Sequence, residues 1–184
     1  MPSLHKHNVP ALFVALIASA GLTSVALAGG GGVGTGGGGG VGGSSSGGHN
    51  YVFPLPAKHD YGDGFGAGRD HQGQDVFAKC GSKLIAIRSG RVQQVDFQSA
   101  AGNYIVIDPD GTGTDYAYMH LKQKAIPREG SNVRKGEKIG EVGETGNASG
   151  CHLHFEKWTA PGYYEGGHAS RNVTKVLKSW DKYS

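Results

Sequence analysis

Two histidines separated by one leucine stand in the segment GCHLHFE, residues 150–156. Side chains alternate between the two faces of a β-strand, so His152, His154 and Glu156 would share one face there, with the apolar residues between them in a core. Imidazoles held on a rigid strand could form half of a metal site. They could also be two solvated histidines on an outer face, and the segment alone does not decide.

Other histidines and acids could complete such a site. In the segment DHQGQD, His71 and Asp75 lie four positions apart, a spacing that puts them on one face of either a helix or an extended chain. A further histidine, His120, comes near the end of the run DYAYMHL. Zinc accepts histidine nitrogen and aspartate oxygen, and a catalytic zinc site keeps three protein ligands and one open, water-bearing position. Together these residues indicate zinc chemistry.

The elements that must position these residues are short. Apolar, β-rich runs alternate with turn signals such as Ser89-Gly90, Glu129-Gly130 and Thr145-Gly146. This spacing predicts an all-β sandwich or barrel of antiparallel strands. The predicted strands cover residues 83–87, 91–97, 103–108, 115–121, 137–143 and 152–158.

The flanks of this region are different. Residues 51–70 are rich in Gly, Pro and Asp and are predicted to form a loop that leads into the fold. In the tail, Val173, Val176, Leu177 and Trp180 follow helical spacing behind Asn172, which suits an N-cap. This pattern predicts a short C-terminal helix packed on the sheet.

The N-terminal segments are predicted to lie outside the folded domain. Residues 1–28 combine a basic start, an apolar run and small residues at the end, which is typical of a secretory signal peptide; the alternative is a membrane anchor. Residues 29–50 are rich in Gly and Ser and predict a flexible linker. Residues 51–184 then form one domain, and no stable membrane insertion is expected after signal cleavage.

Charge and cysteine content narrow the function classes. Loss of Lys6 with the signal changes the net charge from +3 to +2, too little to argue for nucleic-acid binding. Export permits a disulfide between the two cysteines, Cys80 and Cys151. Such a bond would close a loop of about 70 residues and contribute roughly 4 kcal/mol. The alternative is a pair of buried thiols.

The segments HQGQD, YMHL and GCHLHFE, in this order, resemble the lysostaphin-like zinc endopeptidases that cut bacterial peptidoglycan. The connecting segments LIAIRSGRV, GNYIVID and VRKGEKIGEVGETGNASG are similar to the strand-and-turn framework of that family. The resemblance covers residues 66–158. It implies an all-β barrel-sandwich hybrid (a duplicated hybrid motif) and an exported enzyme, secreted or held in the cell envelope, that acts on peptidoglycan peptides as a monomer.

The resemblance also implies residue roles. His71, Asp75 and His154 would be the ligands of one zinc ion per chain. His120 and His152 would be the catalytic pair beside the metal. Two neutral imidazoles and one carboxylate leave a zinc site positively charged, which favours ionisation of its water, and the two remaining histidines could move the proton.

Four residues are predicted to contact substrate. Tyr118 would line the site by the same resemblance. Thr145 and Asn147 precede the site strand and are expected in one wall of a groove, where backbone groups would pair with an extended peptide. Arg69 lies near the first motif and is either a partner for a substrate carboxylate or a solvated side chain.

Three alternatives stay open on the sequence alone. A structural zinc site would be closed by a fourth protein ligand, with Cys151 as the candidate, although that residue is expected to face away from His154. A wall-binding or hydrolase-activating module could retain zinc without catalysis. A thiol peptidase could use Cys151 together with a nearby histidine.

Overall fold

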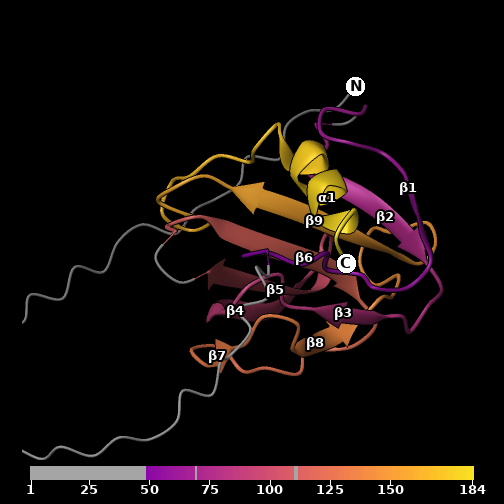
Figure 1. Ribbon diagram of the computed structural model, residues 1–184. Coiled ribbons are helices and arrows are strands. Elements are labelled where there is room, and N and C mark those ends of the chain that lie inside the picture. The colour runs from indigo at the N-terminus through magenta and orange to yellow at the C-terminus, as the bar shows by residue number, and fades with distance from the viewer. Residues whose placement is uncertain (1–48, 69, 110–111) are drawn as a thin grey trace, which may run out of the picture. The chain divides into compact units, whose positions relative to one another are not determined.

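The part of the chain that the structure describes contains a seven-stranded antiparallel sheet, a two-stranded sheet and one helix (Figure 1). The structure is a computed structural model and describes residues 49–68, 70–109 and 112–184. The elements are β1 (His59–Tyr61), β2 (Gln74–Ala78), β3 (Lys83–Ile85), β4 (Gly90–Gln98), β5 (Gly102–Pro109), β6 (Asp115–Leu121), β7 (Asn132–Val133), β8 (Lys138–Glu141), β9 (His152–Trp158) and α1 (Val173–Asp181). The large sheet has the order β1-β2-β9-β6-β5-β4-β7, and β3 pairs with β8 in the small one. The signal-peptide prediction and all but the last two residues of the predicted linker lie outside the described residues.

The predicted antiparallel β-fold with a short C-terminal helix is confirmed. Each of the six predicted runs overlaps a strand, and the runs 115–121 and 152–158 coincide with β6 and β9. Three strands lie outside the six predicted runs: β1, which is inside the predicted leading loop, β2 and β7. β1 and β7 are three and two residues long, too short to display an alternating pattern.

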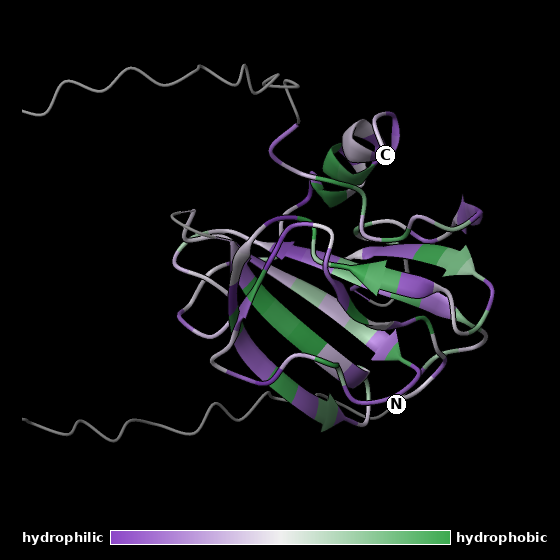
Figure 2. Cartoon of the chain, turned by 60° about the horizontal axis from the view of Figure 1, so that its bottom comes forward, coloured by the Kyte–Doolittle hydropathy of each residue, from purple (hydrophilic) through white to green (hydrophobic). Residues whose placement is uncertain are grey.

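Alternation along β9 separates the core from the site. Leu153 and Phe155 are fully buried in the main hydrophobic cluster. His154 and Glu156 lie on the opposite face, where their side chains are hydrogen-bonded to each other. Figure 2 shows hydrophobic and hydrophilic segments interspersed along the strands, as expected for a sheet whose two faces have different roles.

Helix α1 packs beside β9 (Figure 1) through a stripe of buried apolar residues, Val173, Leu177 and Trp180. Asn172 occupies the predicted N-cap position, but its side chain makes no capping hydrogen bond and instead accepts one from Ser170 Oγ. Apolar packing rather than capping therefore holds this short helix. No helix in the described ranges is long and apolar enough to cross a lipid bilayer.

Cys80 and Cys151 form a disulfide in the structure. Cys80 lies just beyond the end of β2, and Cys151 lies just before the start of β9. The strands β2 and β9 are hydrogen-bonded neighbours in the sheet. These two strands carry Asp75, His152 and His154, so the disulfide ties together the elements on which the predicted site depends.

Candidate metal centre

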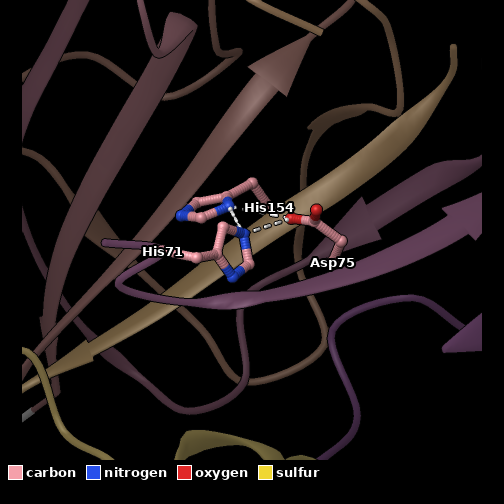
Figure 3. Close-up of side chains that lie close together, drawn as sticks. All are labelled: His71, Asp75 and His154. Atoms are coloured by element: carbon pink, nitrogen blue, oxygen red, sulfur yellow. Dashed lines mark hydrogen bonds and ion pairs between the residues drawn. The ribbon is translucent and has the colours of Figure 1, made fainter. Parts of the chain in front are cut away.

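The structure brings together the three residues predicted to bind a metal. His71 lies in the loop before β2, while Asp75 in β2 and His154 in β9 are directly opposite each other in the sheet register. His71 Nε2 is 3.0 Å from Asp75 Oδ1 and 3.0 Å from His154 Nδ1, and His154 Nδ1 is 2.8 Å from Asp75 Oδ1. Figure 3 shows the three side chains pointing toward one another from these separate segments.

The outer nitrogen of each imidazole in this group is held by an acceptor. His71 Nδ1 donates to the carbonyl oxygen of Gly64 at 2.9 Å, and His154 Nε2 donates to Glu156 Oε1 at 3.0 Å. A neutral imidazole carries one proton, so these bonds leave the lone pairs of His71 Nε2 and His154 Nδ1 directed at the centre of the group. Histidines that bind metals in proteins almost always donate their second nitrogen in this way.

These three residues fit a zinc ion. Tetrahedral zinc with bonds of about 2.1 Å places its ligand atoms roughly 3.4 Å apart, close to the separations found here. Among the described residues, His71, Asp75 and His154 are the histidine, cysteine or acidic side chains close enough together to share an ion. No fourth such side chain in the described ranges joins them. Cys151, the candidate fourth ligand of a closed site, is bonded to Cys80. The donor set is therefore that of an open site.

Nearby charges and burial shift the pKa values of Asp75 and His154 in opposite directions. Burial disfavours ionised Asp75, but the hydrogen bond from His154 and the nearby histidines outweigh burial and lower the pKa of this carboxyl group. Burial likewise opposes protonation of His154, yet its hydrogen bonds to Asp75 and Glu156 raise the pKa of the imidazole to about 9. A metal ion at this position would replace the proton on Nδ1.

The two histidines predicted to act in catalysis lie next to this group and to each other. The ring centroids of His120 and His152 are 4.6 Å apart, and His152 Nε2 is 3.7 Å from Asp75 Oδ1. His120 Nδ1 donates to the carbonyl oxygen of Thr145 at 2.8 Å, and His152 Nδ1 donates to that of Gly150 at 2.9 Å. Since carbonyl oxygens only accept, each ring keeps its Nε2 as an acceptor when neutral.

The environment of His120 keeps its ring uncharged. Burial, together with the neighbouring His152 and His154, lowers the pKa of His120 to about 4, although the hydrogen bond to Thr145 opposes the shift. At neutral pH this imidazole is therefore an unprotonated acceptor at Nε2. Its backbone has a φ of 60°, in the left-handed region that residues with a Cβ rarely adopt.

The residues predicted to contact substrate have different positions. Contrary to expectation, Tyr118 does not line the site: its side chain is 0% exposed in the main core, where its hydroxyl accepts a hydrogen bond from the backbone of Ile87. It lies opposite Phe155 in the sheet register, on the core face. Asn147 is exposed, but its backbone N–H already donates to the carbonyl oxygen of Ala100. Arg69 lies outside the described residues.

Thr145 serves the site in another way than predicted. Its carbonyl oxygen accepts from His120, and its hydroxyl donates to the carbonyl oxygen of Leu121 at 2.7 Å and accepts from the N–H of Asn103 at 3.0 Å. These groups are thus used inside the protein rather than being available to an extended peptide. Thr145 orients His120.

Two residues that lie at the site, Glu156 and Gly73, were not assigned a role from the sequence. Glu156 was placed on the face of His154 without a role, although its spacing of two from His154 in a strand was a signal for contact. Gly73 brings the chain close to the site: a Cβ there would lie 2.6 Å from His154 Nε2 and 2.7 Å from the carbonyl oxygen of Phe155. The glycine in HQGQD carries no comparable signal because close approach is a tertiary property.

The sequence profile of peptidase family M23 matches residues 69–167. The chain belongs to this family. The resemblance inferred from the three histidine motifs is confirmed, and the M23 match includes every histidine and acid of the candidate site. The site geometry therefore occurs within a metallopeptidase family.

Relatives of this M23 chain include proteins of Haemophilus influenzae and Vibrio cholerae. An uncharacterized metalloprotease of Haemophilus influenzae is 38% identical over 89 residues, which are 48% of this chain and 18% of that protein. The peptidoglycan DD-endopeptidase ShyC of Vibrio cholerae is 34% identical over 86 residues, 47% of this chain and 19% of that protein. The matches thus span about a fifth of the length of these relatives.

Solved structures share the M23 fold. The catalytic domain of lysostaphin from Staphylococcus simulans aligns with a TM-score of 0.57 and 29% identity, covering 65% of this chain and 92% of that domain. A zinc-containing peptidase from Vibrio cholerae aligns with a TM-score of 0.54 and 29% identity, covering 59% of this chain and 36% of the other. The fold prediction is confirmed by these likenesses together with the antiparallel sheet.

Proposed function

We propose that this M23 protein is an exported zinc endopeptidase that hydrolyses peptide bonds in peptidoglycan, acting as a monomer outside the cell or in its envelope. The observation that carries the proposal is the convergence of two imidazole nitrogens and one carboxylate oxygen within 3.0 Å of one another. Two further histidines with an available Nε2 lie beside this trio. The relatives named as peptidoglycan endopeptidases and lysostaphin support the choice of substrate.

The residues of the trio would hold one zinc ion through His71 Nε2, Asp75 Oδ1 and His154 Nδ1. When bound, zinc supplies a Lewis acid that polarises a carbonyl group and lowers the pKa of a water molecule toward about 7. The protein contributes fixed ligand directions, because the outer nitrogens of both imidazoles are already bonded to Gly64 and Glu156.

His120 and His152 would transfer the proton from the attacking water to the leaving amine. Both keep Nδ1 on a backbone carbonyl oxygen, so Nε2 accepts the proton of the attacking water and returns it to the amine that leaves when the peptide bond breaks. The water oxygen bonds to the carbonyl carbon as the C–N bond breaks, which yields one new carboxyl end and one new amino end.

Digestion of purified peptidoglycan, followed by mass spectrometry of the released fragments, tests the proposal. New amino and carboxyl ends should appear with the zinc-loaded protein, disappear after chelation, return on addition of zinc, and be absent with Asp75→Ala. Wall binding without new ends would instead favour a non-catalytic binding or activating module. Undiminished release after complete zinc removal would exclude the zinc mechanism.

A thiol peptidase is disfavoured by the position of its proposed nucleophile, because Cys151 is joined to Cys80. If alkylation under non-reducing conditions abolished peptide release while chelation did not, the thiol mechanism would replace the zinc mechanism.

Export rests on the apolar N-terminal segment of the sequence. The protein recovered outside the cytoplasm should lack residues 1–28, and N-terminal sequencing should begin in the glycine-rich segment that follows. An intact N-terminus retained in the membrane fraction would favour the anchor instead.

A further inference from the structure

Glu156 lies at the ring nitrogen of His154 that does not face Asp75. Its Oε1 accepts a hydrogen bond from His154 Nε2 at 3.0 Å, while Nδ1 of the same ring is 2.8 Å from Asp75 Oδ1. The side chain of Glu156 is only 7% exposed, so water does not substitute easily for its partners. Because Glu156 accepts a hydrogen bond from Nε2, it favours the form of His154 that carries its proton on Nε2.

The second oxygen of Glu156 is also in use. Oε2 accepts from the indole Nε1 of Trp158 at 2.7 Å, and the Trp158 ring packs edge-to-face on Tyr163 with centroids 4.7 Å apart. An indole N–H can only donate. The two carboxylate oxygens of Glu156 thus each accept from a different donor.

We propose that Glu156 is a positioning residue that selects the tautomer of His154 able to bind the metal, with its orientation fixed by Trp158. By accepting from Nε2, the carboxylate leaves the lone pair of Nδ1 facing His71 and Asp75. The opposite tautomer would put a hydrogen atom at Nδ1 and block the metal position. This inference rests on the zinc site of the proposed function, but concerns affinity rather than the reaction catalysed.

Glu156→Gln tests whether the two acceptor oxygens of Glu156 matter, because an amide has one acceptor group and one donor group. If its oxygen accepts from Trp158, its NH₂ faces His154 Nε2 and favours the blocking tautomer. If its oxygen faces His154, its NH₂ opposes the indole N–H, two donors in contact. Trp158→Phe removes the indole donor, so the amide oxygen can then face His154 without conflict.

The experiment measures zinc affinity by competition with a chelator for the wild-type protein, Glu156→Gln, Trp158→Phe and the double variant. Glu156→Gln should weaken zinc binding by about 10- to 100-fold, and Trp158→Phe in that background should restore most of the loss. Glu129→Gln removes the same charge at an exposed position remote from these contacts and should bind zinc like the wild type.

Each result separates the possibilities. Equal affinity of the wild type and Glu156→Gln would overturn the inference, and so would equally weak binding by Glu156→Gln in both backgrounds, since loss of charge alone would then explain the effect. A wild-type protein that binds no zinc would overturn the proposed function together with this inference.

Nuclear magnetic resonance of the zinc-loaded wild-type protein gives an independent readout, which holds even if Glu156→Gln fails to fold. The imidazole of His154 should carry its proton on Nε2, with slow exchange against solvent because Glu156 binds it. A proton on Nδ1, or a freely exchanging Nε2 proton, would contradict the proposed contact.

Discussion

At the level of single residues, His120 combines a strained backbone with a buried, neutral imidazole. Its φ of 60° costs a residue with a Cβ about 1–2 kcal/mol. The backbone N–H donates to the carbonyl oxygen of Ala101 at 2.8 Å, and the ring donates to Thr145. Strain of this kind persists where neighbouring contacts impose it and is common at functional sites. Here it occurs at a ring that lies beside His152, with centroids 4.6 Å apart.

Replacing His120 by Gly or by Ala should separate strain from function. Both variants should lose peptidase activity and still bind zinc, because His120 is not one of the proposed ligands. His120→Gly should be about 1 kcal/mol more stable to denaturant than His120→Ala, since glycine adopts a positive φ without strain. Loss of zinc by either folded variant would mean that His120 binds the metal.

Gly73 matters because there is no room for a Cβ between its backbone and His154. Gly73→Ala should weaken zinc binding about tenfold or more, because the new Cβ would displace His154 from its ligand position. Gly68→Ala is the matched control in the same loop, since a Cβ there meets nothing within 4 Å. Chelator competition on both variants measures the effect, and equal affinities would show that His154 can shift without losing its ligand geometry.

At the level of elements, the segments 100–102 and 145–147 position His120, the proposed catalytic histidine. A Cβ on Gly102 would lie 2.3 Å from the carbonyl oxygen of Thr145, and Gly102 also has a positive φ of 66°. The N–H of Asn147 donates to the carbonyl oxygen of Ala100 at 2.9 Å. This close backbone contact places the Thr145 carbonyl where it can orient His120, while β2 and β9 separately carry two of the proposed metal ligands, Asp75 and His154.

Gly102→Ala should therefore lower peptidase activity by about 10- to 100-fold through displacement of Thr145 and His120, with zinc affinity unchanged. Gly136→Ala is the control, because Gly136 also has a positive φ, 79°, but open space around it. Both variants should lose about 1 kcal/mol of stability from backbone strain. Gly102→Ala should lose more than Gly136→Ala, because its Cβ would also clash with Thr145. A parallel loss of zinc by Gly102→Ala would show that the two parts of the site are not independent.

At the level of the whole molecule, the site joins segments far apart in the chain. His71 and His154 are 83 positions apart, and the disulfide between Cys80 and Cys151 spans 71 positions. Pairing of β2 with β9 brings both pairs of residues together in the folded protein. Zinc binding, the disulfide and the fold should consequently stabilise one another.

Zinc should raise the unfolding temperature of the protein. A ligand that binds only the folded state at 100 times its dissociation constant adds about 2.7 kcal/mol. Thermal unfolding with and without zinc should show this shift for the wild-type protein and not for His154→Ala. A similar shift in His154→Ala would place the stabilising ion elsewhere.

The double variant Cys80→Ser/Cys151→Ser should be less stable by roughly 4 kcal/mol, the entropy of closing a loop of this length in the unfolded chain. Denaturant unfolding under non-reducing conditions measures the difference, and mass spectrometry of the intact wild-type protein checks that the bond forms. If free thiols are found in the native protein, the cysteines are a buried pair instead.

The sequence by itself determined most of the strands, the C-terminal helix and the types of chemistry. Alternation with a period of two is a local property, so strands such as β6 and β9, and the face shared by His154 and Glu156, follow from it. The three histidine motifs likewise predicted the family. Very short strands such as β1 carry too few residues for such a pattern.

Only the tertiary structure decided which groups meet. Tyr118 faces the core because β6 and β9 pair in one register, Thr145 orients His120 because two loops touch, and Glu156 is held by both His154 and Trp158. The close approach that requires glycine at positions 73 and 102 has the same origin. Contacts between residues distant in sequence depend on register and side-chain volume across the whole fold, and no local pattern of residues encodes them.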